Sequence, residues 1–141
     1  MLLTDSADIP IGDGWLYETK YDGYRCLLCW EKGKQVPDLI SRNGRVLNKS
    51  FPEIVRCCES ISYDIQSYLP LMLDGEIVYL INDYQSNFSI VQKRGRMKDI
   101  QNIEFQANAF PCHYVVFDLL QFKGKSHSNH QLKTRKQQLA Q

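Results

Sequence analysis

The chain has 141 residues, of which 43% are hydrophobic and 23% charged, and its formal net charge is +1. This size and composition predict one packed globular domain and exclude collagen-like, mucin-like and disordered chains. Uninterrupted apolar runs stay well below the ~18 residues of a membrane span, and the first ten residues, with two Asp and no Lys or Arg, do not resemble a secretory signal. Five cysteines are an odd number, so we expect a reduced, cytoplasmic chain.

The first half of the chain predicts strands followed by one helix. Segments rich in aromatic and apolar residues predict strands over residues 15–20, 24–30 and 36–42. Pro37 cannot donate a hydrogen bond to a neighbouring strand, so the third strand is expected at a sheet edge. Ser50-Phe51-Pro52-Glu53 matches a capping box, and apolar residues then follow at spacings of three and four until Pro70, which predicts an amphipathic helix.

The second half alternates strands and helices. We expect a strand at 71–81, a short helix at 88–94, an apolar strand at 110–120 and a helix from 132 onward. Asp118 lies inside the apolar strand and needs a partner there. Cys26 and Cys29 are three residues apart on a strand and therefore point to opposite faces, which does not favour a metal site. The order of elements predicts an α+β fold with mainly antiparallel sheets and packed helices.

The segment from Glu18 to Arg25 is the sharpest chemical feature. Lys20 stands at the end of a predicted strand, and a lysine becomes a nucleophile when its environment holds it neutral. Gly23 permits close approach of the backbone to a ligand, and Arg25 supplies a planar fork for a phosphate or carboxylate. On its own, such a segment is more often a surface hairpin with an ion pair.

Four sequence blocks that occur in one order favour a functional role for this segment over a surface hairpin. Together they resemble the ATP-dependent DNA ligases of the covalent nucleotidyltransferase superfamily. The blocks are Lys20-Tyr21-Asp22-Gly23-Tyr24-Arg25 (Lys-x-Asp-Gly-x-Arg), Ser41-Arg42-Asn43-Gly44 with Phe51-Pro52-Glu53-Ile54, Leu73-Asp74-Gly75-Glu76-Ile77-Val78, and Tyr114-Val115-Val116-Phe117-Asp118-Leu119-Leu120 followed by Gly124. The resemblance covers residues 15–139, and its details are closest to bacterial end-joining ligases of the D type. It implies a partial nucleotidyltransferase adenylation domain, an ATP-grasp-like ligase fold.

The resemblance implies a role for each of six residues. Lys20 would attack the α-phosphorus of ATP and become lysyl-AMP, while Glu18 would read the adenine and Phe117 would stack on it. Arg25 and Arg42 would contact ribose or phosphate groups, and Glu76 would hold the ribose or a metal ion. Taken singly, Glu76 is as well explained as an exposed strand residue, Phe117 as core and Arg42 as a solvated turn residue.

The implied cofactors are ATP and Mg²⁺ or Mn²⁺, and the implied substrate is nicked double-stranded DNA, sealed in DNA repair and recombination. A DNA end-binding protein of the Ku type is an implied partner, no membrane partner is expected, and the protein would act as a monomer. A basic cluster is expected at an exposed turn around Gly95, where it would contact DNA phosphates without base specificity or merely keep the surface solvated. The cluster consists of Lys93, Arg94, Arg96 and Lys98.

The chain departs from the family pattern at its C-terminal end. A fourth motif with an acidic residue and a fifth with two lysines are expected after Phe117, and neither is present. We therefore expect residues 1–14 to be a lead-in and residues 15–141 to be an incomplete adenylation domain without an OB-fold domain, unable to ligate and at most weakly self-adenylating. The alternatives are a non-catalytic remnant that binds adenine nucleotide or DNA and, less favoured, an RNA ligase or guanylyltransferase.

Overall fold

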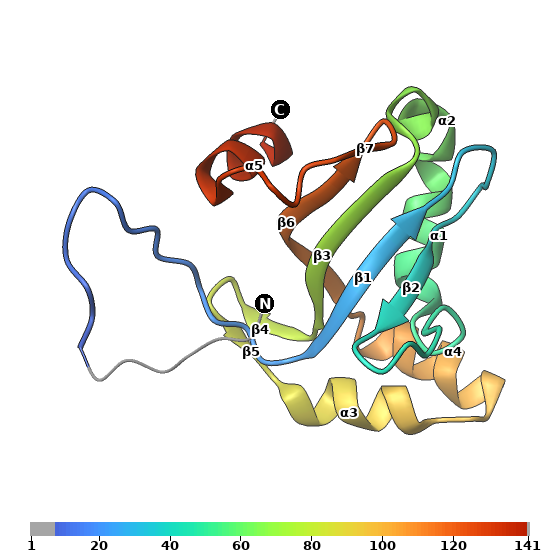
Figure 1. The fold of residues 1–141 in the computed structure, drawn as a ribbon. Helices are drawn as coiled ribbons and strands as arrows, with labels where there is room; N and C mark the ends of the chain where they lie inside the picture. The colour runs from blue at the N-terminus through green and yellow to red at the C-terminus, as the bar shows by residue number, and fades with distance from the viewer. Residues whose placement is uncertain (1–7, 141) are drawn as a thin grey trace.

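The fold is organised around an antiparallel sheet in the order β2-β1-β3-β6-β7, seen in a computed structural model that describes residues 8–140 (Figure 1). A small two-stranded sheet pairs β4 with β5. The strands are β1 (Tyr24–Trp30), β2 (Asp38–Ser41), β3 (Leu71–Val78), β4 (Leu80–Asn82), β5 (Gln85–Ser86), β6 (His113–Phe122) and β7 (Lys125–Ser126). The expected α+β class with an antiparallel sheet is confirmed, and β2 lies at the edge that Pro37 predicts.

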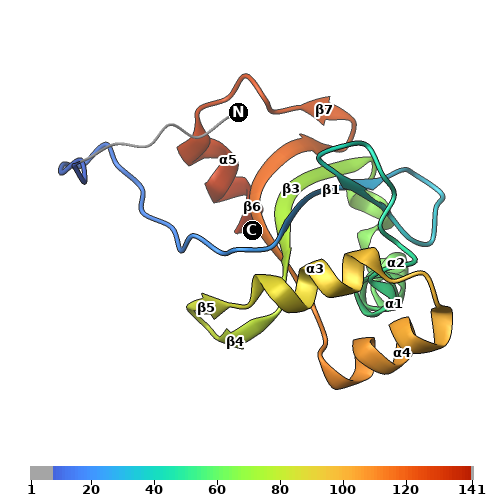
Figure 2. The same cartoon turned by 90° about the horizontal axis from the view of Figure 1, so that it is seen from below.

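Helices cover the two faces of the sheet unequally. They are α1 (Pro52–Ser60), α2 (Ser62–Ile65), the 3₁₀ helix η1 (Gln66–Tyr68), α3 (Phe88–Arg96), α4 (Ile100–Ala109) and α5 (Leu132–Leu139). Helices α1 to α4 gather on one side, where they enclose the core, and α5 lies against β6 on the other side (Figure 2). The fully buried core includes Leu39, Phe51 and Ile77. Among the described residues, no helix is long and apolar enough to cross a membrane.

The N-terminal segment is not the strand that its sequence predicts. Residues 15–20 form no ladder with any described strand, and they run along an extended arm that stands away from the body (Figure 1). Trp15, Leu16 and Tyr17 are each more than half exposed. A strand exists only where a neighbouring edge accepts its hydrogen bonds, and the sheet gains such an edge only from Tyr24 onward.

Two helix predictions need correction. The capping box does not form, because Phe51 is the N-cap of α1 without a side-chain cap bond and Glu53 is bonded elsewhere. The apolar periodicity up to Pro70 is divided among α1, α2 and η1. Helix α4 was not predicted, although Asp99, which accepts a bond from the Asn102 backbone N–H, is a cap signal that precedes it.

The basic cluster around Gly95 is not an exposed turn. Helix α3 continues through it to Arg96, and Gly95 is buried so closely against Tyr24 that a Cβ there would lie 2.3 Å from the ring. Arg94 is only 1% exposed, and its guanidinium donates to Glu53 and to the carbonyl of Phe110. The expectation that Arg94 contacts DNA is therefore wrong, because its charge is satisfied inside the protein.

Candidate functional site

Arg25 is held by an acidic partner on the face of the sheet opposite helices α1 to α4, called here the open face. It lies in β1, and its Nε and Nη2 donate to the two carboxylate oxygens of Asp74 in β3 at 3.1 and 2.7 Å. Asp74 is buried, so this paired geometry is what allows its charge to stay there. The Asp74 carboxylate raises the pKa of Arg25, which fixes both the charge and the direction of the guanidinium.

Glu76 lies opposite Arg25 in the register of β1 and β3 and closes the site from below. The backbone N–H of Gly23 donates to its Oε1 at 3.1 Å. Burial raises the pKa of Glu76, against the opposing effects of this N–H and of Arg25. Gly23 comes so close to β3 that a Cβ would lie 2.1 Å from the carbonyl oxygen of Ile77, so this approach requires glycine.

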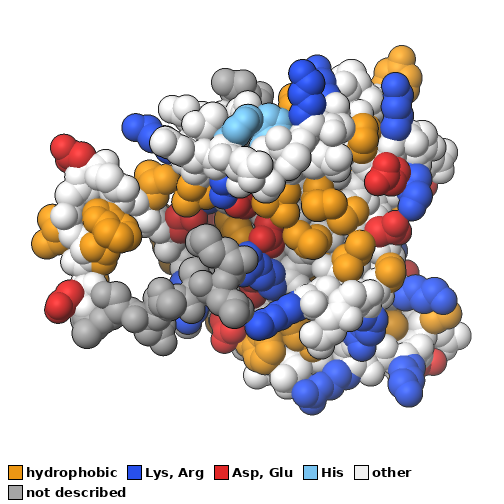
Figure 3. All heavy atoms as spheres, viewed as in Figure 1, with side chains coloured by type: hydrophobic (Ala, Val, Ile, Leu, Met, Phe, Trp, Pro, Cys, Tyr) orange, Lys and Arg blue, Asp and Glu red, His pale blue; other side chains and the backbone are white. Residues whose placement is uncertain are grey.

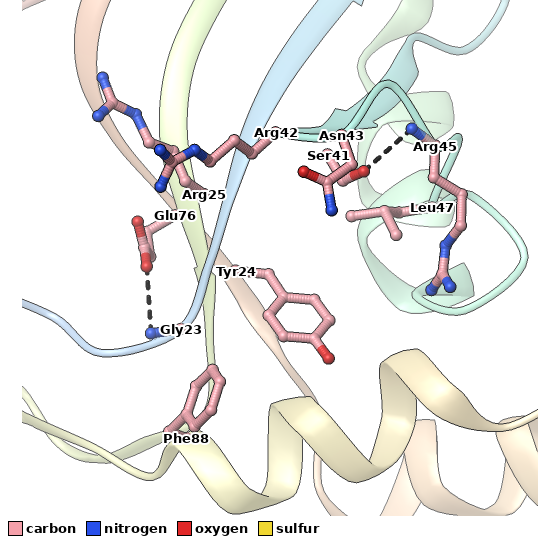
Figure 4. Close-up of a pocket in the computed structure, with 10 residues that line it drawn as sticks. All are labelled: Gly23, Tyr24, Arg25, Ser41, Arg42, Asn43, Arg45, Leu47, Glu76 and Phe88. Atoms are coloured by element: carbon pink, nitrogen blue, oxygen red, sulfur yellow. Dashed lines mark hydrogen bonds between the residues drawn. The ribbon is translucent and has the colours of Figure 1, made fainter. Parts of the chain in front are cut away.

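A pocket of about 460 Å³ opens above these residues (Figure 4). This volume falls within the ~300–1,000 Å³ usual for small-molecule sites. Its far wall is the turn after β2, where the Arg45 backbone N–H donates to Ser41 Oγ at 3.0 Å and the Arg45 guanidinium donates to the carbonyl of Gly95. The lining residues are Gly23, Tyr24, Arg25, Ser41, Arg42, Asn43, Arg45, Leu47, Glu76 and Phe88.

Arg42 makes this pocket suitable for an anion. Its side chain is exposed and forms no hydrogen bond or ion pair with the described residues. In Figure 4 it extends toward Arg25 above Glu76. Two guanidinium groups on one side of a pocket suit the oxygens of a phosphate chain.

Phe117 lies beside Arg25 on the same face. It is in β6, next to a bulge in the pairing with β3, and the Arg25 guanidinium carbon is 5.5 Å from its ring centroid. This is a cation–π distance. Arg25 therefore covers part of the ring face that a nucleotide base would need for stacking.

Helix α5 is fastened to this face through Asp118. Arg135 donates from Nε and Nη2 to the two carboxylate oxygens at 2.7 and 2.8 Å, which supplies the partner that an acid inside an apolar strand requires. Partial burial raises the pKa of Asp118, but the Arg135 guanidinium outweighs it, and the net pKa lies below the ordinary value. Sequence reasoning missed Arg135, although the isolated Asp118 was a signal that a basic partner must exist.

The two remaining predicted site residues lie outside the pocket. Lys20 is exposed on the N-terminal arm and forms no hydrogen bond or ion pair with the described residues. Glu18 is paired with Lys136 of α5. Just after Lys20 the arm is anchored to the β4–β5 hairpin, where Tyr21 Oη donates to the carbonyl of Asp83 and the Asp22 N–H donates to Ser86 Oγ. The structure thus places Arg25, Arg42 and Glu76 in the pocket wall, sets Phe117 against Arg25 beside it, and leaves Lys20 and Glu18 on the arm.

Glu76 is not part of a metal site made of protein side chains alone. Within residues 8–140 no three or more His, Cys, Asp or Glu side chains are grouped so that they could hold an ion. The nearest carboxylate on the same strand, Asp74, is bonded to Arg25. This arrangement still fits Mg²⁺, which is commonly bound by one or two carboxylates together with the phosphates of a nucleotide.

Comparison with known proteins decides the family. The sequence profile described as "ATP dependent DNA ligase domain" matches residues 7–141. The chain belongs to this family. It is 44% identical over 124 residues to the bifunctional non-homologous end joining protein LigD of Bacillus subtilis, covering 88% of this chain and 20% of that protein. It is 28% identical over 145 residues to DNA ligase C1 of Mycolicibacterium smegmatis, covering 100% of this chain and 39% of that protein.

Solved structures agree with the sequence comparison on the ligase family. The ligase domain of Mycobacterium tuberculosis LigD superposes with a TM-score of 0.62 at 27% identity, covering 87% of this chain and 35% of that chain. A mycobacterial DNA ligase D complexed with ATP and MES superposes with a TM-score of 0.65 at 26% identity, with the same coverage. The predicted resemblance to end-joining ligases of the D type is thereby confirmed, and the chain spans about a fifth of the length of the Bacillus relative.

Proposed function

We propose that residues 15–141 are part of a DNA ligase adenylation domain of the end-joining type, in which Lys20 accepts AMP from ATP. The observation that carries this proposal is the pocket in which Arg25 and Arg42 stand above Glu76, with the Phe117 ring against Arg25 next to the pocket. The pocket offers two cations for phosphates and a carboxylate for ribose or metal, and the neighbouring Phe117 offers a surface for stacking. The solved relative described as complexed with ATP supports adenine nucleotide as the ligand class.

Binding would first rearrange Arg25 and Phe117. The adenine stacks on Phe117, so the guanidinium of Arg25 moves off the ring toward the ribose and phosphates while Asp74 keeps it on the same face. Arg42, which extends toward Arg25 in the same pocket (Figure 4), meets the phosphates beside it. Mg²⁺ or Mn²⁺ would be held by Glu76 together with the phosphates, and it supplies charge neutralisation on them.

Lys20 is close enough along the chain to reach the bound nucleotide. Gly23 in the pocket wall is three positions further along the chain, and an extended chain spans at most ~3.3–3.6 Å per residue, so the Cα of Lys20 stays within ~11 Å of Gly23. Once Lys20 has lost its proton, its Nζ attacks the α-phosphorus, a nitrogen–phosphorus bond forms, and the bond from that phosphorus to the bridging oxygen breaks. Pyrophosphate leaves with the electron pair of that bond.

The DNA side of the reaction is part of the same proposal. AMP would pass from Lys20 to the 5′-phosphate of nicked double-stranded DNA before the 3′-hydroxyl displaces it, in end-joining repair alongside a Ku-type end-binding protein. The exposed basic residues Lys93, Arg96 and Lys98 are the proposed phosphate contacts, and Arg45 adds a fourth charge beside them.

Intact-mass measurement after incubation with ATP and Mg²⁺ or Mn²⁺ tests the nucleotide chemistry. It is made on this chain and on a chimera in which the chain replaces its matching segment in the Bacillus LigD ligase domain. We expect an AMP adduct on Lys20 in the chimera and at most a weak one in the chain alone. Both Lys20→Ala and Lys20→Arg abolish it, because a guanidinium stays protonated. Lys32→Ala, in an exposed turn, is the matched control.

The same experiment separates the second candidate function. A protein that binds ATP without transferring AMP is favoured by one observation, the position of Lys20 outside the pocket. ATP binding to the chimera without an adduct would support that candidate and overturn the proposal. In a parallel incubation with GTP in place of ATP, a GMP adduct formed in preference to the AMP adduct would instead support a guanylyltransferase.

A further inference from the structure

Two histidines meet in the segment between β7 and α5, away from the pocket. His127 Nδ1 and His130 Nδ1 are 3.1 Å apart, and the two rings are nearly perpendicular with centroids 4.8 Å apart. Histidine side chains are visible at the surface of the face shown in Figure 3. The sequence places both residues in a polar stretch, and no role in the nucleotide chemistry uses them.

The backbone holds this pair in place. The His130 N–H donates to the carbonyl of His127 at 2.9 Å, which closes a turn and brings residues i and i+3 onto one side. The His127 N–H donates to the carbonyl of Leu120, and its ring packs edge-on against Phe122. His127 is only 7% exposed, whereas His130 is open to solvent. One ring is thus fixed in the protein, and the other remains accessible.

The separation of the two nitrogens suits a shared ion. Two imidazole nitrogens that each lie ~2.0–2.1 Å from one metal ion are ~2.9 Å apart at a right angle and ~3.4 Å apart at the tetrahedral angle. The observed 3.1 Å lies between these values. Without an ion, the two nitrogens are at hydrogen-bond distance, with one ring as the donor and the other as the acceptor.

We propose that His127 and His130 chelate one divalent transition-metal ion through their Nδ1 atoms. Imidazole ligands suit Zn²⁺, Ni²⁺ and Cu²⁺, in contrast to the oxygen ligands that Mg²⁺ takes. No third His, Cys, Asp or Glu joins the pair within residues 8–140, so water completes the coordination. The site is therefore an accessible two-ligand chelate, and it does not depend on the proposed ligase function.

A bound ion would stiffen the attachment of α5 to the sheet. The carbonyl of His130 accepts a hydrogen bond from Arg135, and Arg135 also holds Asp118, the neighbour of Phe117. Fixing the turn at residues 127–130 therefore fixes one partner of Arg135. Because the ion binds the folded turn and not the unfolded chain, it raises the melting temperature of the protein.

Titration calorimetry with Zn²⁺ and with Ni²⁺ tests this site. We expect one ion per chain in the wild type and in His113→Gln, a control at the third histidine. We expect affinity to fall more than ~10-fold in His127→Leu, which fills the buried position with an apolar side chain, and in the exposed variant His130→Gln. Melting temperature should rise with metal in the first two proteins only. Equal affinity in all four proteins would overturn the proposal, as would thiolate absorption bands when Co²⁺ is bound.

Discussion

The two faces of the sheet each contain an arginine paired with a carboxylate, and the two pairs serve different purposes. Between the sheet and its helices, the side chain of Arg94 is 1% exposed and that of Glu53 13%. On the open face, the side chain of Arg25 is 39% exposed above an Asp74 side chain that is 11% exposed. The first pair joins α3, α1 and the segment before β6, whereas the second presents a guanidinium to the pocket. An arginine–carboxylate pair thus stabilises the fold when it is buried, and it can bind a ligand when the arginine is exposed to solvent.

The largest stability difference between the faces is expected at Arg94. Arg94→Ala leaves the Glu53 carboxylate without its cation and frees the carbonyl of Phe110, so it should lower the free energy of unfolding by about 3–5 kcal/mol. Arg96→Ala, two residues further on and exposed, should change it by less than about 0.5 kcal/mol. Urea denaturation of both variants measures the difference. Equal losses of unfolding free energy in the two variants would show that the buried Arg94–Glu53 pair does not stabilise the fold.

Gly95 tests how tightly the same face is packed. Helix propensity alone favours alanine over glycine by about 1 kcal/mol. In Gly95→Ala, however, the new methyl group meets the ring of Tyr24 at 2.3 Å, so we expect a net loss of about 1–2 kcal/mol. Gly14→Ala on the exposed arm, where nothing lies within 4 Å, is the control. A gain in the melting temperature of Gly95→Ala would contradict this packing.

On the open face, Asp118 should reveal its pair with Arg135 through pH. Because the folded-state pKa of Asp118 lies below its unfolded value, its stabilising effect is present above the unfolded pKa and is lost as pH falls through the folded pKa. Asp118→Asn should therefore cost about 1–2 kcal/mol at neutral pH, and the cost should shrink in acid. Denaturation curves across the acid range measure this. A cost independent of pH would exclude the charge as its cause.

Glu76, on the same face, should affect the pH dependence of stability in the direction opposite to Asp118. Burial raises the folded-state pKa of Glu76, so ionisation of this carboxyl group opposes folding. The free energy of unfolding that the protonated group favours is therefore lost as pH rises through the acid range. Glu76→Gln should consequently gain stability relative to the wild type as pH rises, while Asp118→Asn loses it. Parallel pH profiles for the two variants would contradict the assigned environments.

The smallest effect on stability and the clearest effect on DNA are expected from the exposed lysines and arginine of the basic cluster. In the chimera with the Bacillus ligase domain, changing Lys93, Arg96 and Lys98 to Ala should weaken binding to nicked duplex. Each lost phosphate contact should lower the salt dependence of log K by about 0.9. Stability should barely change, which is the reverse of Arg94→Ala. Unchanged affinity and salt slope would mean that these residues only keep the surface solvated.

Local chemistry in the sequence was enough to predict the charged residues Arg25, Arg42 and Glu76 that line the pocket. The Lys-x-Asp-Gly-x-Arg block predicted Gly23 and Arg25 at a turn that enters a strand, and the Leu73–Val78 block predicted Glu76 in another strand. The turn and the strand are found as predicted, because strand alternation and glycine turns depend on neighbours close in the chain, whereas the pairing of the two strands is known only from the structure. Residues 15–20 show the limit, because a strand pattern forms no strand without an edge to pair with.

Composition, motif order and strand periodicity by themselves determined the α+β class, the ligase family and three of the six proposed nucleotide residues, Arg25, Arg42 and Glu76, which line the pocket. Only the tertiary structure decided the fate of Arg94, because burial and pairing with Glu53 depend on α1 and α3 meeting across 41 positions of the chain. The same holds for Arg135 on Asp118 and for Lys136 on Glu18, which join segments 17 and 118 positions apart. The sequence shows which charged side chains could bind a ligand. The packing of distant segments decides whether such a side chain is instead paired with a residue inside the protein.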